Sequence, residues 1–190
     1  QWLAVSGLLS PAVGGAPVKP YEVTQSFKPM GRDKGQGLYR RSVYTFWKRT
    51  GPAPVMMALD ASKRDVCSVK RERTSTPLQA LVLLNDPQLN EAARVFGEKM
   101  LGKHGKDHPA MLAEMFRSVT SRKARDKELE ILQRIFREQR EHFSKDPAAA
   151  KKFLAVGDAK RDDKLAVEDA AAAGVLAVTL FNLWESLAAY

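Results

Sequence analysis

A cationic group of side chains stands directly before a predicted helix. Lys70, Arg71 and Arg73 precede Thr76 and Pro77, where that helix is expected to begin. Free backbone N–H groups and the helix dipole favour anions at such a terminus. Arginine can bind a carboxylate, phosphate or sulfate through two parallel hydrogen bonds. The pattern therefore predicts an anion site; the alternative, which we favour, is that the arginines tie this segment to the helical core.

Aromatic and cationic residues alternate in a second segment, residues 39–49. Arg40 and Arg41 stand close in sequence to Tyr44 and Trp47. Aromatic rings interleaved with cations can stack on bases or on sugar rings. An amphipathic segment whose rings belong to the core gives the same pattern, and we favour that interpretation. The β-branched and aromatic content suggests a strand, but the spacing of the apolar side chains also fits a short helix, which we prefer.

Cysteine and histidine offer little further chemistry. The single cysteine, Cys67, excludes a disulfide framework and any multi-cysteine metal site. Neighbouring cations could make its thiol reactive, but a lone cysteine among valines is more often buried, which is what we expect. His104 and His108 are four residues apart, yet Gly105 and Pro109 indicate a loop, so no metal site is predicted. No phosphate-loop, dinucleotide-binding or serine-nucleophile pattern is present either.

The net charge of +9 is concentrated in one part of the chain. Residues 19–76 hold 13 Lys/Arg and 5 Asp/Glu, whereas the remaining residues hold 18 and 17. A cationic segment attracts nucleic acid, anionic glycans, lipid headgroups or an acidic domain. The alternative that we favour is a cationic surface, or arginines that are satisfied internally. The most apolar run, residues 170–184, is shorter than the roughly 20 residues that span a bilayer, so no transmembrane segment is expected.

Helix signals become clear from residue 76 onwards. Thr76, Pro77 and Gln79 form a start signal with a capping box. Helices are expected over residues 76–84, 86–102, 109–119, 126–143, 147–154 and 164–187. Residues 11–38 are rich in glycine and proline and are predicted to be irregular.

These signals predict a mainly α fold with five or six helices in an orthogonal or bundle-like cluster and an irregular Gly/Pro-rich N-terminal arm. We expect a helix end and a cationic arm over residues 1–75, packed on a helical core over residues 76–190, as one domain overall. The first residues resemble the middle of a helix, so the chain is interpreted as a fragment of a larger protein.

Two runs of sequence resemble a known family. They are Leu38-Tyr-Arg-Arg-Ser-Val-Tyr-Thr-Phe-Trp-Lys-Arg-Thr50 and the longer run from Asp65 through Thr-Pro-Leu-Gln-Ala-Leu to Pro87. Both resemble the planctomycete secreted domain of unknown function. The sequence departs from the family pattern at Ser75, where Asn is usual, at Ala61-Ser62, where Ala-Pro is usual, and at Trp184, where an acidic residue is usual.

The resemblance implies the C-terminal domain of large exported proteins, in the periplasm or an equivalent compartment. Those proteins often carry a cytochrome-c-like domain, so haem is expected in an upstream domain and no cofactor in this chain. The family has no established catalytic residues to carry over. The domains that accompany it in those proteins imply links to redox chemistry or to polysaccharide breakdown.

We therefore expect a non-catalytic accessory or interaction domain that docks upstream domains of its parent protein or binds an anionic polymer such as polysaccharide. The alternative is part of an enzyme, with Arg71, Arg73 or Asp60 facing a cleft shared with upstream domains. The exported context disfavours nucleic acid. Any function is expected near the junction of the arm with Thr76 and Pro77.

Overall fold

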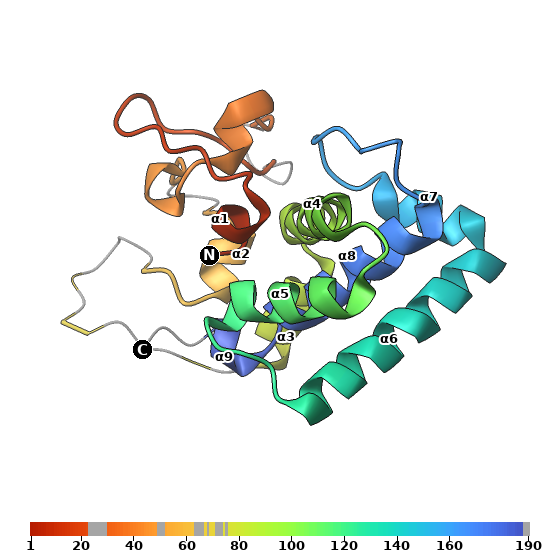
Figure 1. Cartoon of the computed structure of the whole chain (residues 1–190). Coiled ribbons are helices and arrows are strands. Elements are labelled where there is room, and N and C mark those ends of the chain that lie inside the picture. Colours follow the sequence, from red (N-terminus) through yellow and green to blue (C-terminus); the bar gives the residue numbers. More distant parts are fainter. Residues whose placement is uncertain are drawn as a thin grey trace. The chain divides into compact units, whose positions relative to one another are not determined.

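The computed structural model describes residues 1–22, 30–48, 52–62, 67, 69–70, 74 and 76–187 (Figure 1). Within these residues the chain is mainly helical and contains a single isolated β-bridge, which confirms the predicted fold class. The chain forms two compact units. Gln1–Leu8 and Pro87–Tyr190 form one, called here the helical unit, and Leu9–Asp86 form the other, called the arm unit.

The helices fall into both units. The helical unit contains α1 (Trp2–Ser6), α4 (Pro87–His104), α5 (His108–Thr120), α6 (Asp126–Lys145), α7 (Pro147–Leu154), α8 (Val167–Phe181) and α9 (Trp184–Leu187). The arm unit contains α2 (Pro54–Ala58), α3 (Pro77–Asn85) and two 3-10 helices, η1 (Gly35–Tyr39) and η2 (Ser42–Tyr44). None of the helices in the described ranges has both the length and the apolar character that a membrane span requires.

Three helices begin with a side-chain cap followed by a proline, and the sequence predicts this cap at the first of them. Thr76 accepts the N–H of Gln79 at α3, and the Gln79 side chain accepts the N–H of Thr76 in return, which completes the capping box. Asp107 caps α5 and Asp146 caps α7, each followed within the first turn by a proline. Local chemistry alone therefore sets these boundaries.

The core of the helical unit lies along α8, which packs against both α4 and α6 (Figure 1). Ala170, Ala171, Ala172 and Ala173 are all fully buried. On α4, a Cβ atom added to Gly97 would lie 2.8 Å from the Ala173 carbonyl carbon and from the Gly174 nitrogen. The two helix backbones therefore lie in direct contact, which only small side chains permit.

Three expected helix boundaries are wrong. The helix predicted to end at Gly102 continues to His104, and Gly105 follows it with a φ of 58°. His104 and His108 consequently lie at helix ends rather than in a loop. The last helix begins at Val167 and breaks after Phe181, where the side-chain Nδ2 of Asn182 donates to Val178 O at 2.8 Å.

The short helix expected over residues 39–49 is also wrong for the part that the structure describes. Two 3-10 turns, η1 and η2, end at Tyr39 and Tyr44, and the chain is then extended. Val18 pairs with this stretch as a parallel bridge to Thr45, through hydrogen bonds from Val18 N to Tyr44 O and from Phe46 N to Val18 O. A backbone partner far away in sequence therefore overrides the local helical spacing.

We expect Gly97→Ala to destabilise the protein by about 1–3 kcal/mol, because the added methyl group would force the α4 and α8 backbones apart. Gly102→Ala is the matched control on the same helix, since nothing lies within 4 Å of its added Cβ. This control should be neutral or stabilising by up to about 1 kcal/mol. Urea denaturation followed by circular dichroism measures both, and equal effects of the two changes would contradict the close packing.

Candidate functional site

The predicted cationic group before α3 is described only in part. Lys70 is exposed, whereas Arg71 and Arg73 lie outside the described residues. Both residues that form the capping box, Thr76 and Gln79, lie at the start of α3 as expected. The structure therefore places the helix start and one of the three cations.

A carboxylate from the end of α2 holds this helix start in place. The Asp60 backbone is left-handed, with a φ of 58°. Its carboxylate accepts the N–H of Thr74 at 2.7 Å, the Thr74 hydroxyl at 2.9 Å and the Gln79 amide at 3.1 Å. Asp60 is thus a cross-link between two parts of the arm unit. Sequence patterns missed these contacts, although aspartate is one of the few residues that tolerate a left-handed backbone.

The α3 helix exposes three large apolar side chains. Leu78, Leu81 and Leu84 are 59%, 57% and 51% exposed, whereas Leu83 is buried. These leucines recur every three residues, so they share one side of a short helix. Sequence reasoning identified the helix but not this exposed face. The available signal was that nearly every residue of α3 is apolar. Any face of this helix that points to solvent must therefore carry apolar side chains.

Arg40 and Tyr44 form a closed contact within the arm unit. The Arg40 guanidinium donates to Ala16 O at 3.1 Å, and also to the carbonyl oxygens of Gly14 and Ala12. It lies 4.0 Å from the centroid of the Tyr44 ring, and the Tyr44 hydroxyl accepts the N–H of Gly14. Carbonyl groups of the chain itself therefore bind both terminal nitrogens of this arginine, in line with the interpretation that such arginines are held internally.

The other candidates of this segment lie apart from that contact. Arg41 is exposed and Trp47 is half-buried. Cys67 is exposed, so the expectation that it is a buried apolar residue is wrong. Val69, one of the two neighbouring valines that suggested burial, is itself fully exposed, and the other, Val66, lies outside the described residues.

The histidines take part in separate contacts. His104 Nε2 lies 2.6 Å from Glu114 Oε2, and Lys103 also contacts this carboxylate. Lys103 and then His104 hold the pKa of Glu114 below its usual range. The His108 ring packs edge-on against Phe136 at 4.9 Å. Across the described ranges, no group of three or more potential metal ligands comes together.

The family model of PSD1, described as a protein of unknown function (DUF1553), matches residues 1–136. The chain belongs to the PSD1 family. This confirms the resemblance to a domain of unknown function that was drawn from the sequence. No curated protein matches the chain, and no solved structure matches it.

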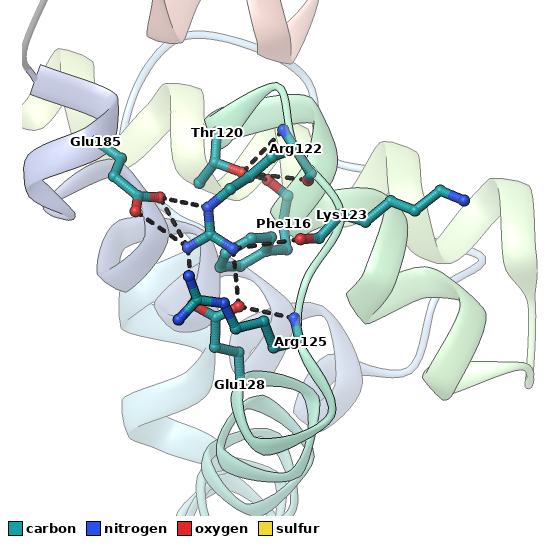
Figure 2. A network of polar contacts seen from close by, with 7 residues as sticks. All are labelled: Phe116, Thr120, Arg122, Lys123, Arg125, Glu128 and Glu185. Atoms are coloured by element: carbon teal, nitrogen blue, oxygen red, sulfur yellow. Dashed lines mark hydrogen bonds and ion pairs between the residues drawn. The ribbon is translucent and has the colours of Figure 1, made fainter.

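The PSD1 match ends within α6. A charged network joins the start of this helix to Arg122, which precedes it, and to α9. In Figure 2, the Arg122 guanidinium lies between Glu128 of α6 and Glu185 of α9. It donates to Glu128 at 2.7 and 2.8 Å and to Glu185 at 3.0 and 3.1 Å, while stacking over the Phe116 ring. The network thus fastens α9 to the start of α6.

The two partners shift one another's pKa in opposite directions. The Arg122 guanidinium and the backbone N–H of Arg125 lower the pKa of Glu128 to about 2. Glu128 and Glu185 in turn raise the pKa of Arg122. The charged groups of Arg122, Glu128 and Glu185 all bind within the network, so the arrangement fits a structural cross-link rather than a site for a ligand.

We expect acid to weaken the fold through Glu128. A carboxyl whose pKa is lowered on folding stabilises the folded state above its ordinary pKa of 4.5, and this contribution is lost as the pH falls towards the folded-state value of about 2. Glu128→Gln should therefore lower Tm at pH 7, and its difference from the unmodified chain should shrink between pH 4.5 and pH 2.

Thermal unfolding followed by circular dichroism at several pH values measures this effect. Glu130→Gln is the matched control, because Glu130 is an exposed residue of the same helix. A Glu128→Gln difference that stays constant down to pH 2 would contradict the network as described.

Proposed function

We propose that this PSD1 chain is a non-catalytic interaction domain that docks against a protein surface through the exposed leucines of α3. The observation that carries the proposal is the exposure of Leu78, Leu81 and Leu84 by half or more. Contiguous apolar side chains on the surface of a soluble domain mark interaction sites more often than chance. Short helices of this kind bind partners through side chains that repeat every three or four residues.

The charge of the arm unit indicates the kind of partner. Residues 9–86 hold 13 Lys/Arg and 6 Asp/Glu, a net charge of +7 out of +9 for the whole chain. A second copy of the same surface would be repelled by this charge, whereas an acidic surface would be attracted. The partner we propose is therefore an apolar protein segment flanked by acidic residues, supplied by an upstream domain of the same exported protein.

Binding of an anionic polysaccharide has less support. The guanidinium of Arg40 is already bound to three carbonyl groups, and it covers the face of the Tyr44 ring on which a sugar could stack. Arg41 and Lys70 are exposed and remain able to attract a polymer. Attraction by scattered cations of this kind is screened at physiological salt.

The enzyme alternative depends on Asp60, Arg71 and Arg73. Thr74 and Gln79 already bind the Asp60 carboxylate, which favours a structural role for it. The two arginines lie outside the described residues. We therefore give the docking function preference.

We also propose that the protein is exported and that any haem belongs to an upstream domain. This proposal rests on the resemblance carried by residues 38–50 and 65–87. Fractionation of the native cells with an antibody against this chain tests it. We expect the protein in the periplasm or an equivalent compartment, and recovery in the cytoplasmic fraction would contradict the proposal.

Site-specific photo-crosslinking tests the docking surface. The photoreactive residue p-benzoylphenylalanine is placed at Leu81 in the native cell, and crosslinked peptides are sequenced by mass spectrometry. Ile131 is the matched control, because it is an apolar side chain of similar exposure, 47%, on another helix. We expect crosslinks from position 81 to a protein segment that contains both apolar and acidic residues. We expect no crosslinks from position 131.

The control variant for this experiment is Leu78→Ser, combined with the photoreactive residue at position 81. Because the side chain is more than half exposed, the change should alter stability by no more than about 0.5 kcal/mol. The variant should nevertheless lose the interaction. Crosslinks from position 81 to a second copy or to glycan, or equal crosslinking from position 131, would contradict the proposed function.

A further inference from the structure

Two buried charged residues of α4 fix the connection that follows α7. Glu91 and Arg94 are each 1% exposed. One Glu91 oxygen accepts the N–H groups of Asp158 and Ala159, both at 2.6 Å. Arg94 donates to Val156 O at 3.3 Å and to Ala159 O at 2.7 Å. Four hydrogen bonds from the helix therefore hold a segment that has no regular secondary structure.

Gly157 allows this segment to lie close to α4. Its backbone is left-handed, with a φ of 91°, and a Cβ atom at this position would overlap the Glu91 side chain. Arg94 also contacts Glu98 at 3.1 Å, so that its buried charge is paired. The segment is consequently held in one conformation before any ligand arrives, and such preorganisation lowers the entropic cost of binding.

A surface pocket of about 290 Å³ lies beside this fixed segment. Its lining residues come from the end of α7 and from the connection, and are Lys151, Leu154, Ala155, Gly157, Ala159 and Arg161. Only two of them carry charge, and both are cations. Glu91 is buried and does not line the pocket. The volume is close to the lower end, about 300 Å³, of pockets that bind small molecules.

The two cations retain hydrogen-bonding capacity. The Nε–H group of Arg161 is buried and has no hydrogen-bond partner within the described residues. One terminal nitrogen makes a long bond of 3.4 Å to Leu165 O. The nearest carboxylate, that of Asp163, lies 3.9 Å from Nε and is 92% exposed, so water competes strongly for it. The Arg161 side chain as a whole is 24% exposed, so its terminal nitrogens, rather than the enclosed Nε–H, can donate to a ligand oxygen.

We propose that this pocket binds a small anion that carries a carboxylate, sulfate or phosphate group. Arg161 donates through its terminal nitrogens, and Lys151 adds a second positive charge from α7. The pocket admits a group no larger than a small organic acid or a single modified sugar. The site lies beyond residues 1–136 and within the helical unit, so it is separate from the docking surface of α3.

Nuclear magnetic resonance of the whole chain tests the proposal. Sodium phosphate, sodium sulfate and sodium acetate are titrated separately, with sodium chloride adjusted to hold ionic strength constant. We expect a saturable shift of the Arg161 Nε–H signal with a Kd of about 1 mM or lower for at least one anion. The anion with the lowest Kd identifies the preferred group.

Two substitutions locate the site. Arg161→Gln and Lys151→Gln should each weaken binding about tenfold. Binding to the Lys151→Gln variant is read from the Arg161 Nε–H signal. Binding to the Arg161→Gln variant is read from the backbone amide signals of Gly157 and Ala159. Lys152→Gln is the matched control, since Lys152 is an exposed neighbour on α7 that does not line the pocket. Lys151 is exposed as well, so its variant keeps the fold even where Arg161→Gln does not. No saturable shift with any of the three anions, or equal weakening by Lys152→Gln, would overturn the proposal.

Discussion

The close approach of α4 and α8 is the constraint on which the helical unit depends. Gly97 lies against the backbone of Ala173 and Gly174, and the neighbouring side chains of α8 are alanines. With the two backbones this near, larger side chains fill the space on either side of the contact, among them Phe96 stacked on Phe181 at 5.8 Å. The position of α8 in turn sets where α6 and α7 can pack.

A second close contact continues from the first. Gly174 leaves room for the ring of Phe153, which comes from α7 and would meet a Cβ atom there at 2.6 Å. The chain that leaves α7 then returns over α4, where Glu91 and Arg94 bind its backbone. Small residues in the core thus determine the place of the charged contacts above it. This is why the proposed anion pocket lies at the end of α7 rather than at the cationic run before α3.

The sequence predicted the elements that local chemistry controls. Capping by Thr76, Asp107 and Asp146, each with a proline in the first turn, fixes where three helices begin. The failures have different causes. Gly102 is an exposed residue at which α4 continues, although glycine often ends a helix. The bridge of Val18 to Thr45 replaces a helix by an extended segment, and Val18 lies outside the window from which a helical period is read.

The candidate site shows the same division between local pattern and tertiary partner. Arg40 beside Tyr44 has the pattern of a ligand-binding pair, but backbone carbonyls of the arm unit occupy the guanidinium. The leucines of α3 have the pattern of a buried helix, yet they are exposed. A sequence pattern indicates which groups a side chain can bind, but it does not show which group contacts that side chain in the folded protein. In this chain carbonyl groups of the fold bind the arginine, whereas half or more of each leucine side chain is exposed. The apolar face rather than the cationic run is therefore the surface that we propose for docking.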